Sequence, residues 1–125
     1  MIGYAVVGSN DVEKAARFYE PLVEMLGAKR VHSFDRRIFY GVTNYELAVV
    51  TPHDGNIAAA GNGNMIALRA PSRQVVDAVH ALALELGGSD EGGPVIRGRE
   101  ESGFYGTYFR EPEGNKFCIF RIGPA

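Results

Sequence analysis

The order of predicted structural elements repeats once along this chain, with a period of about 60 residues. Each half begins with a short apolar segment, at residues 2–7 and 65–68, and continues into an amphipathic helix. Both helices end at a Leu-Gly pair, and each half closes with aromatic and β-branched residues, at 37–51 and 105–121. Such a period indicates a duplicated supersecondary unit. We therefore expect an α+β fold of two tandem βαβββ modules that form curved mixed sheets with the helices on the outside.

The boundaries of these elements follow from local signals. Asn10, with Glu13 three residues later, predicts a capping box at the first helix, and Ser72 predicts the cap of the second. Residues 52–64 lack periodicity and are rich in Pro, Gly and Asn, so they are expected to link the modules. Residues 89–102 are polar and rich in glycine, with one short extended candidate at 94–97. The expected organisation is a single domain, 1–125, with module 1 at about 1–60 and module 2 at about 61–125.

Composition excludes several classes of function. The net charge is −2 and no stripe of Lys and Arg is present, so neither nucleic acid nor a membrane is an expected partner. No apolar run approaches the roughly 18 residues of a membrane span, and no secretory signal is expected after Met1. The lone cysteine, Cys118, cannot form an internal disulfide. These features predict a cytoplasmic protein.

Several segments resemble one family over the whole length of the chain. They are VVGSNDV at 6–12, RFY at 17–19, LGA at 26–28, GNMIA at 63–67, LGG at 86–88, GFYG at 103–106 and YFREPEGN at 108–115. Together they are similar to the vicinal oxygen chelate superfamily, which contains glyoxalases, bleomycin resistance proteins and extradiol ring-cleaving dioxygenases. The resemblance implies the duplicated fold. It says little about activity, because this fold hosts many chemistries.

The resemblance also implies where a metal would bind. Metal-dependent members place four ligands on the concave face of the sheet, one from each of four strands and typically His, Glu, His or Gln, and Glu. The matching positions here are Tyr4, Glu46, Met65 and Cys118, and the second could shift by one residue to Leu47 or Ala48. A hard divalent ion prefers oxygen and imidazole donors, and of the four only Glu46 is a usual ligand. We therefore expect no metal at the family position and no cofactor.

Each candidate also has a structural interpretation. Tyr4 either fills the concave face or orients a ligand through its hydroxyl, and Met65 is expected to form part of a wall. Cys118 lies in an apolar strand, which favours a buried, unreactive thiol over a nucleophile. Glu46 is either a pocket carboxylate or a solvated residue at a strand edge. Arg69 lies four residues after Met65, so in a strand both side chains point to the same face, and we expect the charge of Arg69 at the rim of the concave face.

The histidines carry no metal motif. His32, His53 and His80 are each isolated in the sequence, and no pair has the spacing of a zinc site.

Lys116 lies two residues before Cys118, so in a strand both side chains point to the same face, and Lys116 is a second candidate for a cationic residue at the rim of the concave face.

Two functions remain open at this point. The first is a protein that binds a small, partly apolar molecule in the concave face without a conventional metal site. The alternative is a glyoxalase-like lyase or isomerase, or a dioxygenase-related enzyme, with an atypical metal or metal-free acid/base site around Glu46, assisted by Tyr4. We also expect a homodimer, because each module leaves sheet edges and a concave face open. The expected ligand-binding residues are Tyr4, Glu46, Met65, Arg69, Tyr108, Cys118 and Phe120.

Overall fold

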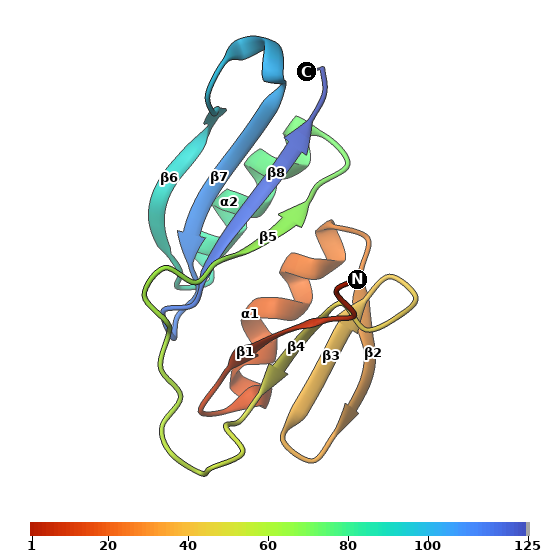
Figure 1. The fold of residues 1–125 in the computed structure, drawn as a ribbon, viewed down its shortest axis with the longest axis vertical. Coiled ribbons are helices and arrows are strands. Elements are labelled where there is room, and N and C mark those ends of the chain that lie inside the picture. The colour runs from red at the N-terminus through yellow and green to blue at the C-terminus, as the bar shows by residue number, and fades with distance from the viewer. Residues whose placement is uncertain (125) are drawn as a thin grey trace.

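The computed structural model describes residues 1–124 and contains two four-stranded mixed sheets. Module 1 consists of β1 (Ala5–Gly8), α1 (Val12–Met25), β2 (Lys29–Phe34), β3 (Arg37–Gly41) and β4 (Leu47–Val50). Module 2 consists of β5 (Ile66–Arg69), α2 (Arg73–Glu85), β6 (Ser89–Ile96), the short 3-10 helix η1 (Glu100–Ser102), β7 (Phe104–Arg110) and β8 (Lys116–Ile122). The predicted fold class and the two modules are confirmed (Figure 1).

The two sheets have the same connectivity. Their strand orders are β1-β4-β3-β2 and β5-β8-β7-β6, so the first strand of each module lies at one edge. That first strand pairs in parallel with the last strand of its module, and the remaining pairs are antiparallel. The helix of each module provides the crossover that a parallel pair requires.

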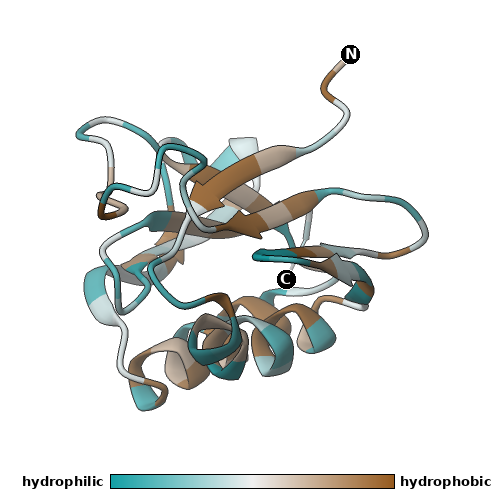
Figure 2. Cartoon of the chain, turned by 90° about the horizontal axis from the view of Figure 1, so that it is seen from below, coloured by the Kyte–Doolittle hydropathy of each residue, from teal (hydrophilic) through white to brown (hydrophobic). Residues whose placement is uncertain are grey.

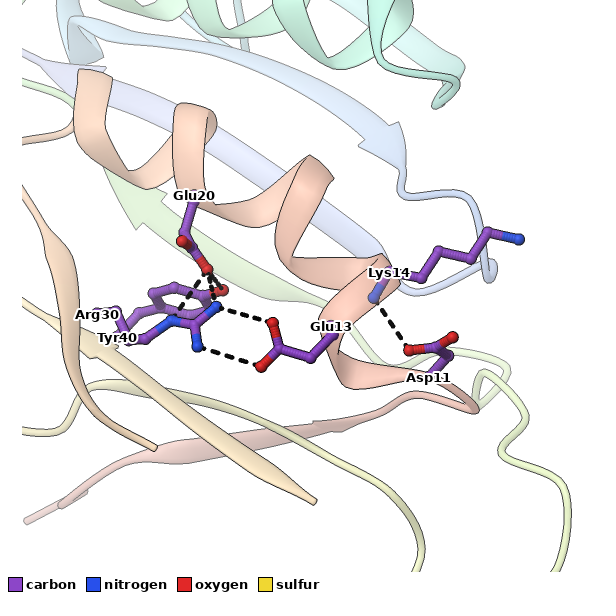
Figure 3. Close-up of polar contacts among 6 residues, drawn as sticks. All are labelled: Asp11, Glu13, Lys14, Glu20, Arg30 and Tyr40. Atoms are coloured by element: carbon purple, nitrogen blue, oxygen red, sulfur yellow. Dashed lines mark hydrogen bonds and ion pairs between the residues drawn. The ribbon is translucent and has the colours of Figure 1, made fainter. Parts of the chain in front are cut away.

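Each helix begins at a side-chain cap. Ser72 Oγ accepts a hydrogen bond from Val75 N at 3.2 Å, which confirms the predicted cap of α2. The prediction for α1 is wrong by one residue. Asp11 is extended and its carboxylate accepts from Lys14 N at 3.0 Å (Figure 3). Asn10 instead bonds to Ala58 in the linker between the modules. Both residue types are good caps, and the tertiary contact of Asn10 decides between them.

The Leu-Gly pairs end the helices through the same motif. After α1, Ala28 N donates to Val23 O at 2.9 Å and Gly27 N donates to Glu24 O at 3.0 Å. After α2, Gly88 N donates to Ala83 O at 2.8 Å and Gly87 N donates to Leu84 O at 3.2 Å. This is the Schellman pattern, which places glycine at the left-handed position. The φ angles of Gly27 and Gly87 are 82° and 100°.

The prediction for residues 89–102 is wrong in extent. Strand β6 covers Ser89–Ile96, far more than the four residues expected. Its register against β7 shifts twice, between Asp90 and Gly92 and between Gly92 and Val95. Bulges break the alternation of apolar and polar side chains, so this strand has no clear period in the sequence.

A single hydrophobic core joins the modules. Helices α1 and α2 contact one another and lie on the same side of the sheets (Figure 2). Tyr19 of α1 contacts both modules: its ring centre lies 6.1 Å from that of Tyr40 on β3 and 5.7 Å from that of Phe117 on β8. Neither helix is long and apolar enough to cross a membrane.

Charged side chains fasten the edge strand β2 to α1. Arg30 of β2 donates to the carboxylates of Glu20 and Glu13 on the helix, and Tyr40 donates its hydroxyl proton to Glu20 at 2.9 Å (Figure 3). The hydrogen bond to Glu20 raises the pKa of the Arg30 guanidinium, and burial raises the pKa of the Tyr40 hydroxyl. This network lies on the helix side of module 1 and holds α1, β2 and β3 together.

Candidate functional site on the open sheet face

The side of both sheets that faces away from α1 and α2 is called the open face here (Figure 2). Side chains alternate between the two faces of a strand. Ile38 and Tyr40 of β3 belong to the core under the helices, so Phe39 between them lies on the open face. By the same alternation, Phe117 and Ile119 of β8 face the core, and their neighbours face outward.

The open face of module 1 carries a cluster of rings, the module 1 aromatic cluster, made up of Tyr4, His32, Phe34, Phe39 and Tyr45. Phe39 and Tyr45 stack with ring centres 4.2 Å apart, and Tyr4 meets Phe39 edge-on at 5.6 Å. His32 stacks on Tyr45 at 6.0 Å. Tyr4, Phe34 and Tyr45 remain exposed despite these contacts. The cluster is therefore an accessible aromatic surface.

Most of this cluster was missed by the sequence analysis. Only Tyr4 was assigned to a site, and His32 was treated as isolated. The signal was present in β2, where His32 and Phe34 lie two residues apart and therefore on the same face of the strand. Tyr45 follows the β3–β4 turn, and its contact with Phe39 depends on the turn geometry, which the sequence does not specify.

The open face of module 2 combines aromatic rings with a thiol. Tyr108 of β7 pairs in register with Cys118 of β8, and Phe120 lies two residues further along β8. Phe104 stacks on Phe120 with ring centres 5.2 Å apart and planes 6° from parallel. The structure thus brings together three of the predicted site residues, Tyr108, Cys118 and Phe120.

The thiol of Cys118 is poorly placed to react. The residue is 1% exposed. Burial raises its pKa, although a hydrogen bond with Tyr108 and the charge of Arg97 act in the opposite direction. The thiolate is the nucleophilic form, so a raised pKa leaves the group protonated and unreactive.

The carboxylate of Glu46 has a local partner. One of its oxygens accepts a hydrogen bond from Val42 N at 2.8 Å and so closes the turn between β3 and β4. A Cβ atom added at Gly41 would lie 3.2 Å from the same oxygen. The side chain is exposed, and its role in the turn accounts for its position.

The remaining predicted residues line two separate clefts between the modules. Glu46 and Arg69 border a cleft of about 400 Å³ at the end of α1. Met65 lies in a second cleft of about 450 Å³, beside Lys116 and along β1. Tyr4 belongs to the module 1 aromatic cluster and lines neither. The predicted residues therefore share the open face and its borders, and they do not line one cavity.

The whole-chain comparison identifies the family. The sequence model of one family, the Glyoxalase/Bleomycin resistance protein/Dioxygenase superfamily, matches residues 1–119 of the chain. The chain belongs to this superfamily. No curated protein matches it.

Solved structures of the superfamily have the same fold. A glyoxalase/bleomycin resistance protein from Albidiferax ferrireducens is 32% identical, with a TM-score of 0.87, and the match covers 98% of this chain and 99% of that one. A glyoxalase-related enzyme from Fulvimarina pelagi is 21% identical, with a TM-score of 0.73 over 97% of this chain and 87% of that one. A fosfomycin resistance protein from Listeria monocytogenes is 16% identical, with a TM-score of 0.68 over 98% of this chain and 93% of that one. The last two likenesses concern the fold alone.

The donor set at the superfamily's metal positions departs from what a hard divalent ion prefers. The residues that the resemblance matches to three of these positions, Tyr4, Met65 and Cys118, carry a phenol, a thioether and a thiol. Glu46, matched to the fourth, accepts a hydrogen bond from Val42 N. Within residues 1–124, no group of three or more His, Cys, Asp or Glu side chains is arranged to hold a metal ion. These residues do not fit the metal of the metal-dependent members.

Proposed function

We propose that this superfamily member binds a small, partly apolar molecule on its open face, without a conventional metal site. The observation that carries the proposal is the content of that face: exposed or half-buried rings cover it, and the ring of Tyr4 and the thioether of Met65 stand at positions that the resemblance matches to metal ligands. Pockets that hold planar organic molecules are lined mainly by apolar and aromatic side chains with a few polar groups. Tyr4 and Tyr108 supply hydroxyls that can orient a ligand, and Met65 supplies an adaptable wall.

An enzyme of the lyase or isomerase type is the alternative, with Glu46 as its base. Val42 N holds one oxygen of Glu46 in the turn between β3 and β4, so a base at this position would have to act through the other oxygen. We also propose a cytoplasmic location, which suits a chain whose only cysteine is a buried free thiol.

We further propose that the protein is a homodimer. Large apolar side chains are exposed on the open face or beside it: Tyr4, Val6, Phe34, Tyr45, Met65, Val95 and Ile122. Large apolar side chains exposed together on one side of a protein are typical of an interaction site. A second copy would cover part of the open face and leave the rest as a lined cavity for the ligand.

The substitution Met65→Arg tests the ligand site. Met65 is 45% exposed, so an arginine can be accommodated without unfolding the chain, but its longer side chain fills space in the cleft beside Lys116. A metabolite and antibiotic panel is first screened by thermal shift, since a ligand that binds the folded state raises its stability. The ligand found should bind the variant at least about tenfold more weakly, because the arginine side chain occupies part of the ligand's space.

The matched control is Leu84→Arg. Leu84 is 38% exposed on α2, on the opposite side of the sheets, and this change should leave affinity unaltered. Unchanged affinity in a folded Met65→Arg protein would place the site elsewhere.

Metal analysis of protein purified without a histidine tag tests the other half of the proposal, the absence of a conventional metal site. A stoichiometric divalent ion would overturn it.

A further inference from the structure

We propose that the open face of module 2 selects planar aromatic molecules that carry a negative charge, such as aryl carboxylates. This inference rests on the proposed function and narrows its ligand to one chemical class. The observation that supports the inference is a set of three cationic side chains that border the aromatic rings of that face: Arg69, Arg97 and Lys116. These cations and the rings beside them are called the module 2 cationic face.

The cations are held close to the rings. Arg97 Cζ lies 5.0 Å and Lys116 Nζ 5.5 Å from the centre of the Tyr108 ring, and Arg69 Cζ lies 5.7 Å from the centre of the Phe120 ring. Cation–π contacts of this length are attractive and orient the charged group. Arg97 is also fixed by its donors, because its Nε donates to Gly106 O at 3.3 Å and its Nη2 donates to Gly93 O. The positive charges are thus already oriented before a ligand arrives.

No carboxylate of residues 1–124 neutralises these charges. The side-chain ion pairs of arginine in this part of the chain involve Arg30, Arg36 and Arg110, and none includes Arg69, Arg97 or Lys116. Three like charges on one sheet face repel one another, and a bound anion relieves that repulsion. Guanidinium groups bind carboxylates and phosphates through paired hydrogen bonds, so Arg97 and Arg69 suit an oxyanion.

The same face supplies a flat apolar surface for the rest of the ligand. The stacked rings of Phe104 and Phe120 lie next to Arg69, and both residues are only partly buried. Gly106 makes room for this arrangement, since a Cβ atom there would lie 2.9 Å from Cε1 of Phe104. A planar ligand can stack on this pair while its anionic group reaches the cations.

Module 1 lacks this combination. Its aromatic cluster has one bordering cation, Arg37, with Cζ 5.3 Å from the centre of the Phe34 ring. Two carboxylates directly follow its rings in the sequence, Asp35 after Phe34 and Glu46 after Tyr45, and negative charges there disfavour an anion. The preference for anions therefore belongs to module 2.

Two isosteric probes test the proposal: naphthalene-2-carboxylate, which is anionic, and naphthalene-2-carboxamide, which is neutral. Each is titrated into ¹⁵N-labelled protein, and binding is followed by amide chemical shifts. The carboxylate should bind about tenfold more tightly than the amide, because hydrogen bonds to a charged group are stronger. Its largest shifts should fall on β7 and β8.

The variants Lys116→Gln and Arg69→Gln should each remove most of this preference, and neither side chain makes a hydrogen bond that the fold needs. Arg97→Gln is the third variant, with its fold checked by the dispersion of the amide spectrum because it loses bonds to two carbonyls. The control Arg36→Gln removes the same charge from the turn between β2 and β3 and should retain the preference.

The outcomes separate the two proposals. Equal affinity for both probes at β7 and β8 would overturn the anion preference and leave the proposed function intact. A preference that survives all three variants, or that falls equally in Arg36→Gln, would also overturn it. Binding of neither probe at millimolar concentration would overturn both proposals.

Discussion

Glu111 shows how one buried side chain connects the two halves of this molecule. It is 3% exposed and accepts three hydrogen bonds, from the Tyr19 hydroxyl at 3.0 Å and from the backbone N–H groups of Glu113 at 2.8 Å and Asn115 at 2.9 Å. Tyr19 lies on α1 of module 1, and the two amides lie in the turn after β7 of module 2. Burial raises the pKa of this carboxyl, although the bond from the Asn115 amide lowers it in part.

This pKa shift predicts a pH-dependent contribution to stability. A folded-state pKa above the ordinary value of 4.5 means that the folded protein binds the proton more tightly than the unfolded chain does. The contribution is therefore complete below pH 4.5 and is lost as the pH rises through the raised pKa. In Glu111→Gln this contribution is absent, so the stability advantage of the wild type over the variant should shrink as the pH rises.

Urea unfolding of both proteins between pH 4 and pH 8 measures this difference, with Glu24→Gln on the exposed side of α1 as the control. An advantage that stays constant or grows with pH would contradict the expected sign.

At the residue scale, strand alternation was enough to predict part of the candidate site. It placed Lys116 and Cys118 on one face of a strand, and the structure pairs Cys118 in register with Tyr108 of the neighbouring strand. It did not reveal that Glu46 bonds to Val42 N, because that contact depends on the path of a short turn. The position of Arg97 was equally hidden, since it follows a strand with two register shifts.

Among the elements, the helix ends are the features that the sequence specifies most directly. Leu-Gly after each helix predicts a left-handed glycine, and Gly27 has φ 82° and nothing within 4 Å of an added Cβ atom. A substitution there is strained by the backbone alone, without a steric clash. Strand β6 is the opposite case, because its bulges depend on contacts with β7 that are distant in the sequence.

The change Gly27→Ala isolates this backbone effect. The left-handed conformation costs a residue with a Cβ atom about 1–2 kcal/mol, so the variant should be less stable by that amount. Chemical denaturation is the measurement. Gly3→Ala is the control, because Gly3 also has open space around its Cα but its φ is outside the left-handed range. Equal stability of the two variants would show that the turn relaxes at no cost.

For the molecule as a whole, the relative placement of the modules depends on contacts that no local pattern reveals. Asn10 N donates to Glu113 at 2.7 Å, and the Asn115 side chain donates to Gly8 O at 3.0 Å. These bonds join the turn after β1 to the turn before β8, more than 100 residues away in the sequence. The duplication predicted each module, but only such long-range contacts place both helices on one side and expose the opposite face (Figures 1 and 2).

The proposed homodimer is the consequence of that exposed face, and Val6→Glu tests it. Val6 is 55% exposed on the edge strand β1, and a carboxylate there would have to be buried in the interface. Burying a charge without a partner costs several kcal/mol, so the variant should sediment as a monomer at micromolar concentration, where the wild type sediments as a dimer. Leu84→Glu, on the far side of α2, should remain dimeric. A wild type that is strictly monomeric would refute the dimer, and the open face would then have to bind its ligand within a single chain.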